Sequence, residues 1–393
     1  MSKSRILFII FTLAIFAVIL LTFLTAQPSP RITASIVGLQ ASNEIAGYAR
    51  AERIRDFKFP DDHGPHPEFQ TEWWYYTGNL QARDGRRFGY QLTFFRRAIT
   101  PTAPPRESDW GTNQIYFAHF ALTDVKNNRH TSTERFSRGA GQLAGARGDP
   151  FRVWIENWNV ETVPSTPLRS AQDATSLHNA RLIADEPGYA LDLMLTSRKP
   201  LVLHGERGLS QKSVEPGNAS YYISFTRLDT EGTITINDEK IAVQGLSWMD
   251  HEWSTAVLGK DAVGWDWFSI QLDDHRELML FQIRQKDGSI EPLSSGTLIE
   301  ADGTTRALTR DQFSIQVLTT WTSPHTRAIY PARWNVAIPS ADIALTITPR
   351  ITNQEMNVSI VYWEGAVAVE GKSRGASVRG SGYVEMTGYA ITR

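Results

Sequence analysis

Asp250, His251 and Glu252 lie between two tryptophans, Trp248 and Trp253. Indole side chains indicate dry surroundings, and burial raises the pKa of a carboxylic acid. A carboxylic acid with a raised pKa can donate a proton near neutral pH. We therefore predict that Asp250, His251 and Glu252 are catalytic residues. The structural alternative is a salt-bridged strand end at the junction of two domains.

A further candidate acid, Asp266, lies between Trp265 and Trp267. Side chains alternate along a β-strand, so the two indoles share one face and Asp266 lies on the other. A pair of inward-facing indoles would form a flat apolar wall for a polyene or a ring system. Ordinary core packing is the alternative. We predict Asp266 as the fourth catalytic candidate.

A third aromatic segment covers residues 72–75, and Arg96 ends the strand-like segment that follows it. An arginine can hold a carboxylate through two parallel N–H donors. Because side chains alternate along a strand, either Glu72, Trp74 and Asp266 lie at a cavity or their neighbouring aromatic residues do. The sequence leaves both arrangements open. The predicted ligand-binding residues are Glu72, Trp73, Trp74, Tyr75, Arg96, Trp248, Trp253, Trp265 and Trp267.

His63 and His66 form a His-x-x-His pair near several carboxylates, which makes zinc a candidate ligand. Gly64 and Pro65 between them indicate a turn, and no second pair of residues lies at ligand spacing, so we predict no metal. The chain has no cysteine, which excludes disulfides and thiol catalysis. It also lacks glycine-rich phosphate-binding motifs, so we predict no cofactor.

The chain contains an internal repeat. Trp73 aligns with Trp265, and both copies continue into an apolar segment that ends in arginine. Two later blocks recur in the same order, because 121–124 resembles 297–300 and 243–250 resembles 378–385. This alignment matches Asp250 with Glu385, so an acid at this position is also compatible with an architectural role. Three repeated blocks in order indicate duplication of one domain.

Alternating apolar segments of strand length predominate from residue 57 onward, and Asp-Gly pairs at 84–85, 287–288 and 302–303 indicate hairpin turns. Short antiparallel strands of this kind close well as barrels. Together with the repeat, the pattern predicts an all-β fold of two consecutive antiparallel β-barrels. We expect a tether at 27–55, one barrel at 56–240 and the other at 241–393.

The first 26 residues indicate a targeting segment, since Lys3 and Arg5 precede an uncharged, mostly apolar run at 6–26. A helix that rises about 1.5 Å per residue would span a membrane over this length. An uncleaved anchor and a cleaved signal peptide both fit, and both predict a periplasmic or extracytoplasmic body. The formal net charge is −2 and the body has no basic run, which argues against a nucleic-acid partner.

Four segments, at 59–69, 71–80, 245–253 and 264–268, resemble the hydroxyneurosporene synthase (CrtC)/AttH-like family, also described as carotenoid 1,2-hydratase-like. The resemblance extends from about residue 55 to the end of the chain. It implies two consecutive lipocalin-like β-barrels, and the apolar run at 6–26 separately predicts a hydrophobic leader helix before them. It also implies, for some members, addition of water across a terminal isoprenoid double bond without a cofactor. Some exported AttH-type members are encoded beside ABC-transporter permeases, which implies a membrane transporter as a candidate partner.

These observations leave two main functions open for an exported protein that binds an apolar isoprenoid, polyene or lipid-like ligand. A hydratase would protonate an alkene with Asp266 or Asp250, position water with His251 or Glu252, and shield the cation with indoles. A non-enzymatic periplasmic carrier, or an accessory factor of an ABC-type exporter, would instead need a roomy apolar cavity with few ionisable groups. A scaffold for a polypeptide partner would need no cavity.

Overall fold

The computed structural model describes residues 45–103, 105, 108, 110–163, 179–256 and 258–390. The predicted leader at 1–26 and most of the predicted tether at 27–55 lie outside these ranges. Within the described part of the chain, every helix is too short or too polar to traverse a lipid bilayer.

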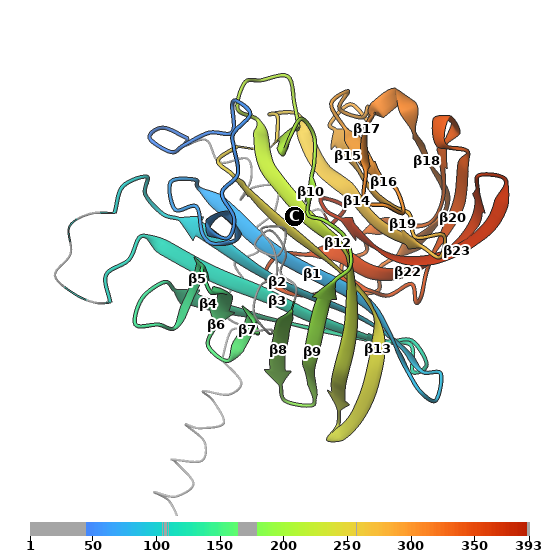
Figure 1. Ribbon diagram of the computed structural model, residues 1–393, viewed down its shortest axis with the longest axis horizontal. Helices are drawn as coiled ribbons and strands as arrows, with labels where there is room; N and C mark the ends of the chain where they lie inside the picture. Colours follow the sequence, from blue (N-terminus) through green and yellow to red (C-terminus); the bar gives the residue numbers. More distant parts are fainter. Residues whose placement is uncertain are drawn as a thin grey trace, which may run out of the picture. The chain divides into compact units, whose positions relative to one another are not determined.

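Two antiparallel β-sheets make up most of the described structure, with β1–β13 in the first and β14–β23 in the second (Figure 1). The first sheet contains β1 (Thr71–Ala82), β2 (Arg87–Ala98), β3 (Gln114–Asp124), β4 (Arg129–Arg138), β5 (Ala144–Gly148), β6 (Phe151–Ile155), β7 (Trp158–Thr162), β8 (Ala180–Glu186), β9 (Tyr189–Ser197), β10 (Val202–Leu203), β11 (Leu209–Gln211), β12 (Ala219–Ile236) and β13 (Glu239–Ser254). The second contains β14 (Ala262–Leu272), β15 (Glu277–Gln285), β16 (Ser295–Ile299), β17 (Thr305–Thr309), β18 (Ser314–Thr322), β19 (Ile329–Ile338), β20 (Ile343–Pro349), β21 (Glu355–Met356), β22 (Tyr362–Ser373) and β23 (Ala376–Met386). The short 3₁₀ helices are η1 (Asp61–His63), η2 (Arg310–Gln312) and η3 (Pro339–Ala341).

Each sheet curls toward closure because its two edge strands are consecutive in the chain. The first sheet runs from β4 to β5, and residues 139–143 join these two strands. The second runs from β17 to β18, which are separated by η2 and one further residue. Connections this short require the edges to approach one another. The predicted all-β fold of two consecutive lipocalin-like barrels is thereby confirmed.

The central strands of the two sheets have the same order, as duplication of one domain predicts. β1 pairs with β2 and β13, and β14 pairs with β15 and β23. The register is also the same, since Tyr75 lies opposite Asp250 and Trp267 lies opposite Glu385. The sequence alignment therefore matches residues that occupy equivalent places in the two barrels.

Strand pairing corrects the predicted boundary between the barrels. β13 begins at Glu239 and pairs with β1 and β12 along its length, so it completes the first sheet. The chain passes to the second sheet between Ser254 and Ala262, later than the predicted boundary at 240. Residues 237–238 form the turn between β12 and β13, so this segment joins two strands of one barrel rather than two domains.

Apolar clusters fill each barrel and the space between the two sheets. One fills the first barrel around Trp74 and Trp158, and a second fills the other barrel around Phe268 and Trp334. A third cluster lies between the sheets and includes Tyr75, Trp248 and Trp267. Both faces of the central strands are thus buried, one in a barrel and one between the barrels.

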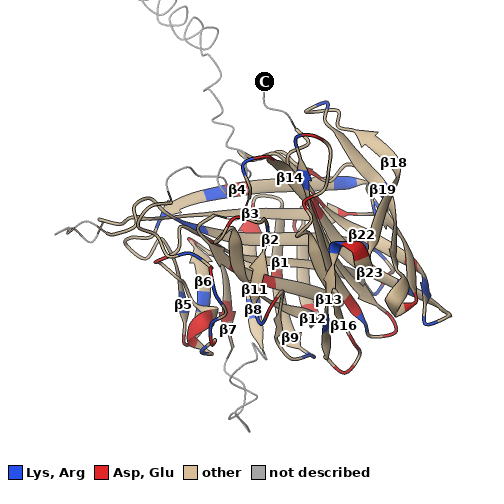
Figure 2. Ribbon diagram, turned by 90° about the horizontal axis from the view of Figure 1, so that it is seen from above, with Lys and Arg blue, Asp and Glu red and all other residues tan. Residues whose placement is uncertain are grey.

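Figure 2 shows positive and negative residues interspersed over the strands and turns of both sheets.

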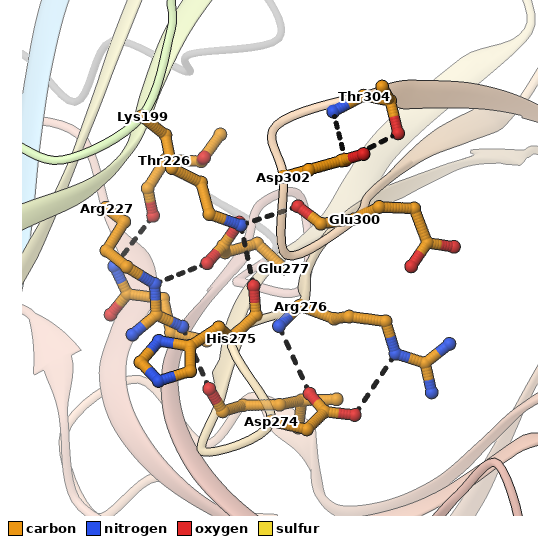
Figure 3. Close-up of polar contacts among 12 residues, drawn as sticks. Lys199, Thr226, Arg227, Asp274, His275, Arg276, Glu277, Glu300, Asp302 and Thr304 are labelled. Atoms are coloured by element: carbon orange, nitrogen blue, oxygen red, sulfur yellow. Dashed lines mark hydrogen bonds and ion pairs between the residues drawn. The ribbon is translucent and has the colours of Figure 1, made fainter.

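A buried ion-pair network also joins the sheets (Figure 3). Lys199, which follows β9, donates from Nζ to Glu277 Oε2 of β15 at 2.6 Å, and to the carbonyl oxygens of His275 and Glu300 at 2.6 and 2.7 Å. Arg227 of β12 donates to the other carboxylate oxygen of Glu277 and to the carbonyl of Leu272 at 2.8 Å. Lys199 and Arg227, from the first half of the chain, therefore both bind the Glu277 carboxylate of the second sheet.

We expect Lys199→Met to lower the free energy of unfolding by about 1.5–3 kcal/mol, because it leaves buried acceptors without a charged donor. Urea unfolding monitored by tryptophan fluorescence measures the change. The matched control is Lys286→Met. The Lys286 side chain is 63% exposed in its pair with Asp261, so its loss should change the free energy of unfolding by less than about 0.5 kcal/mol. If Lys199→Met were as stable as the wild type, the network would not contribute to the stability of the fold.

Candidate active site

A cavity lies between the two sheets, and aromatic side chains from equivalent strands form its walls. Trp73 and Tyr75 of β1 face Trp265 and Trp267 of β14 across this space. Its volume is about 80 Å³, and about 10–15 Å³ on this scale holds one water. The lining residues are Trp73, Tyr75, Thr93, Phe95, Lys212, Tyr222, Asp250, Glu252, Leu258, Trp265, Trp267, Phe281, Ile283, Tyr362 and Glu385.

The structure settles the parity that alternation left open. Trp73 and Tyr75 lie at the cavity, whereas Trp74 and Tyr76 point into the first barrel and are fully buried there. On β14, Trp267 lies at the cavity and Phe268 packs inside the second barrel. The parity that would have put Trp74 and Asp266 at the cavity is therefore wrong.

Asp250 is a buried acid at the cavity with three donors on its carboxyl group. Its Oδ2 accepts from the Tyr222 hydroxyl at 2.7 Å, and its Oδ1 accepts from Trp248 Nε1 at 2.6 Å and from the Ser224 hydroxyl. Burial raises the pKa of Asp250 to about 7, although these hydrogen bonds oppose the rise. The group can therefore give or take a proton near neutral pH.

Glu385 of β23 is the second acid at the cavity, at the place equivalent to Asp250. Its Oε1 accepts from Trp265 Nε1 at 2.8 Å. Burial raises its pKa to about 7, the hydrogen bonds from Trp265 and Glu364 oppose the rise, and the charges of Asp250 and Glu252 add to it. Each sheet thus contributes one carboxyl group that titrates near neutral pH.

Lys212 and Glu252 form an ion pair at the same cavity. Lys212 Nζ lies 3.3 Å from Glu252 Oε1 and 2.9 Å from Ser210 Oγ. The ammonium also lies 4.1 Å from the ring centroid of Phe281, which favours a cation over an aromatic face. Burial lowers the pKa of Lys212, and the charge of Glu252 partly offsets this.

The predicted site residues divide between this cavity and the barrel interiors. Asp250, Glu252, Trp73, Tyr75, Trp265 and Trp267 line the cavity, and Trp248 packs beside it and donates to Asp250. His251, Glu72, Trp74, Arg96 and Trp253 lie on the opposite strand faces, in or at the end of the first barrel. The structure therefore brings together seven of the thirteen predicted residues.

Glu72 centres a separate buried cluster in the first barrel. Glu72 Oε1 lies 2.8 Å from both His66 Nδ1 and His251 Nε2, and Oε2 accepts from Arg96 Nε at 2.8 Å. The three donor groups of His66, Glu72 and His251 lie within 4.8 Å of one another, close enough to hold a metal ion. Arg96 occupies one carboxylate oxygen and adds a positive charge, so the described arrangement is that of an ion-pair network.

Asp266 lies in the second barrel rather than at the cavity. Gln282 Nε2 donates to its Oδ2 at 2.9 Å, and the Tyr389 hydroxyl donates to its Oδ1 at 3.0 Å. Arg284 Nε lies 3.3 Å from Oδ1. Burial raises the pKa of Asp266, and the charge of Arg284 opposes the rise. Its partners make it a buried polar anchor of β14 and β15.

The sequence did not predict several of the residues that line the cavity. Lys212 lies in the short connection before β12, and Tyr222 and Tyr362 lie on strands whose pairing the sequence does not specify. Glu385 did carry a signal, because the repeat aligned it with Asp250. Acidic residues at equivalent positions of the two copies could have predicted that Asp250 and Glu385 share one site.

Comparisons with known proteins agree with this architecture. Residues 50–389 match the AttH-like family. A crystal structure of an AttH protein from Nitrosomonas europaea shares 35% identity and a TM-score of 0.74, over 86% of this chain and 98% of that one. Kievitone hydratase from Nectria haematococca shares the fold at 13% identity and a TM-score of 0.64, over 89% and 98% of the two chains.

A curated relative from Emericella nidulans is named dehydratase asqC. It is 23% identical over 217 residues, which are 52% of this chain and 60% of that protein. The match therefore spans about 60% of that relative's length.

Proposed function

This chain belongs to the AttH-like family, and from this premise we propose that it catalyses hydration or dehydration of a small molecule at the cavity between its barrels. The reaction is cofactor-independent acid–base chemistry. Asp250 and Glu385 act as the acid and base, and the aromatic walls hold the apolar part of the substrate.

One observation carries this proposal. Two carboxyl groups from opposite sheets, Asp250 and Glu385, line one aromatic cavity, and burial raises the pKa of each to about 7. Groups that titrate near the working pH are the effective general acids and bases. Perturbed carboxyl groups of this kind concentrate at functional sites. The hydratase and dehydratase named among the similar proteins support the same class of reaction.

The chemistry follows from the cavity walls. In the hydration direction, a neutral carboxyl group donates a proton to one carbon of a double bond, and positive charge develops on the other. The indole faces of Trp73, Trp265 and Trp267 stabilise that charge. A water molecule then adds to the cationic carbon and loses a proton to the second carboxylate. The same groups in reverse roles remove water.

A carrier function is less well supported by this cavity. A carrier for a polyene needs space and few ionisable groups, whereas this cavity of about 80 Å³ is lined by Asp250, Glu252, Glu385 and Lys212. Such a space suits the reacting end of an apolar chain. We propose an isoprenoid or similarly unsaturated lipid-like end as the substrate group.

Export of the body is part of the proposal, because the apolar run at 6–26 follows two basic residues. Cell fractionation of the full chain tests it, and recovery of the protein with the cytoplasmic fraction would contradict it. Association with a membrane transporter is the corresponding partner hypothesis, tested by crosslinking in the same cells.

The experiment that tests the reaction uses the full chain purified from its source. Native mass spectrometry first identifies any small molecule that co-purifies with the protein. The protein is then incubated in ¹⁸O-labelled water with lipid and isoprenoid extracts, and we expect one compound to gain a labelled water or an alcohol to lose an unlabelled one. A bound compound that stays unchanged would favour the carrier.

The matched control is Asp266→Asn. Asp266 is a buried acid with a raised pKa on the same strand as Trp265 and Trp267, but it lies on the barrel side. We expect Asp266→Asn to convert substrate at a rate close to that of the wild type. Loss of conversion by a folded Asp266→Asn protein would move the reacting site into the second barrel.

A further inference from the structure

A further buried acid, Glu364, lies beside Glu385. Glu364 of β22 lies directly opposite Glu385 of β23 in the sheet register, so both side chains lie on one face. Glu364 is fully buried, and its Oε1 accepts from the Tyr75 hydroxyl at 2.6 Å. Its Oε2 has no donor from any other group that the structure describes.

Register and shared face place the carboxyl groups of Glu364 and Glu385 side by side between the sheets. Two carboxylates are both acceptors, so a hydrogen bond between them requires a proton on one of them. Two negative charges this close in a buried site would also repel strongly. The pair therefore retains one proton where an isolated glutamate would have lost it.

Asp250 has a different environment at the equivalent place. The residue opposite Asp250 in the register is Ser224, where the second barrel has Glu364. Ser224, Tyr222 and Trp248 all donate to Asp250. Three donors favour the ionised form of a carboxyl group, whereas a second carboxyl group favours a protonated pair. The duplicated site has thus diverged into two unlike halves.

We propose that Glu364 and Glu385 form a carboxyl pair that holds the proton donated in the reaction, and that Asp250 is the base. This assignment rests on the proposed function and gives its two acids separate roles. Glu364 is a positioning residue, since it acts through Glu385 and does not line the cavity. Burial and the charge of Glu385 hold the pKa of Glu364 well above its usual range, in agreement with a retained proton.

The first test needs no substrate. Infrared absorption spectra of the full chain, recorded at several pH values from neutral to about 9, report the carbonyl stretch of protonated carboxyl groups. We expect a band that persists above neutral pH in the wild type and in Asp250→Asn, and that is lost or altered in Glu364→Gln and Glu385→Gln. Absence of such a band from the folded wild type would overturn the carboxyl pair, whatever the protein catalyses.

The second test uses the reaction once its substrate is known. Loss of Asp250 ionisation should set the acidic limb of kcat/KM, and loss of the last proton of the pair should set the alkaline limb. Glu364→Gln should move the alkaline limb down by at least about one pH unit and leave the acidic limb in place. A uniform loss of rate with unshifted limbs would mean a merely structural role and would overturn the assignment, while leaving the proposed hydration intact.

Discussion

Asp250→Asn should slow conversion of the substrate about 10²–10⁴-fold, because general acid–base catalysis by one positioned group is worth this much. This range corresponds to about 3–5 kcal/mol of activation free energy. Asparagine fills the same space and cannot take up a proton. Single-turnover rates of wild type and variant, measured at saturating substrate, give the ratio directly.

The fold should tolerate this substitution. The amide oxygen can keep the hydrogen bonds from Trp248 and Ser224, and the amide N–H₂ can donate to the Tyr222 hydroxyl oxygen, which only has to rotate its proton. An unfolding midpoint close to that of the wild type is therefore the required control. A folded Asp250→Asn protein with an unchanged rate would remove Asp250 from the chemistry.

Much of this arrangement could be predicted from the sequence, because duplication leaves a readable trace. Alternating apolar segments with Asp-Gly turns predicted the strands, and the aligned tryptophans predicted two equivalent barrels. The same alternation placed Trp265 and Trp267 on one face, and both lie at the cavity. Asp250 and Glu252 were also predicted, because flanking indoles indicate dry surroundings in which the pKa of a carboxylic acid is raised.

The parity of the strands could not be predicted, and the physical reason is burial on both sides. On an ordinary surface strand, polar residues mark the outer face. β1 and β14 have one face in a barrel and the other between barrels, so both faces are apolar and aromatic. Charged residues such as Glu72 and Asp266 occur on the barrel side, where buried partners neutralise them, and sequence does not distinguish them from cavity acids.

Contacts between segments that are distant in the chain could not be predicted from the sequence, for a different reason. Glu364 sits in an apolar strand with no local motif, and only the register of β22 against β23 sets it against Glu385. Lys212 is brought to the cavity by a connection whose path depends on tertiary packing. Such residues gain their chemistry from the fold, so a single sequence offers no local signal for them.

Glu72→Gln should be among the most destabilising single substitutions in the chain. Glu72 is fully buried and pairs with Arg96, which is also fully buried, and with His66. Removing one partner of a buried ion pair leaves an uncompensated charge and costs about 3–5 kcal/mol. Urea unfolding of the variant measures this change. Asp192→Asn, which removes a half-exposed pair with Arg181, is the control and should cost at most about 1 kcal/mol.

The pH dependence of stability follows from the same cluster. Burial raises the pKa of Glu72, but the charges of Arg96 and His66 outweigh it and hold the pKa well below its ordinary 4.5. Burial lowers the pKa of His66, but the charge of Glu72 and hydrogen bonds to Asp62 and Glu72 outweigh it and raise the pKa above 6.5. The Glu72 contribution is present above 4.5 and lost as the pH falls through its depressed pKa. The His66 contribution is present below 6.5 and lost as the pH rises through its elevated pKa.

The Glu72 and His66 contributions are therefore both present between pH 4.5 and 6.5, and their sum should decline as the pH rises beyond this window. His251 acts in the opposite sense, because burial lowers its pKa and its contribution falls as the pH drops below 6.5. In Glu72→Gln the decline above 6.5 should be smaller, because His66 has lost its principal anionic partner. Unfolding curves at several pH values, with EDTA and with added Zn²⁺, test both points. A midpoint that rises with Zn²⁺ in the wild type but not in Glu72→Gln would identify His66, Glu72 and His251 as metal ligands, and would contradict the ion-pair account of this cluster.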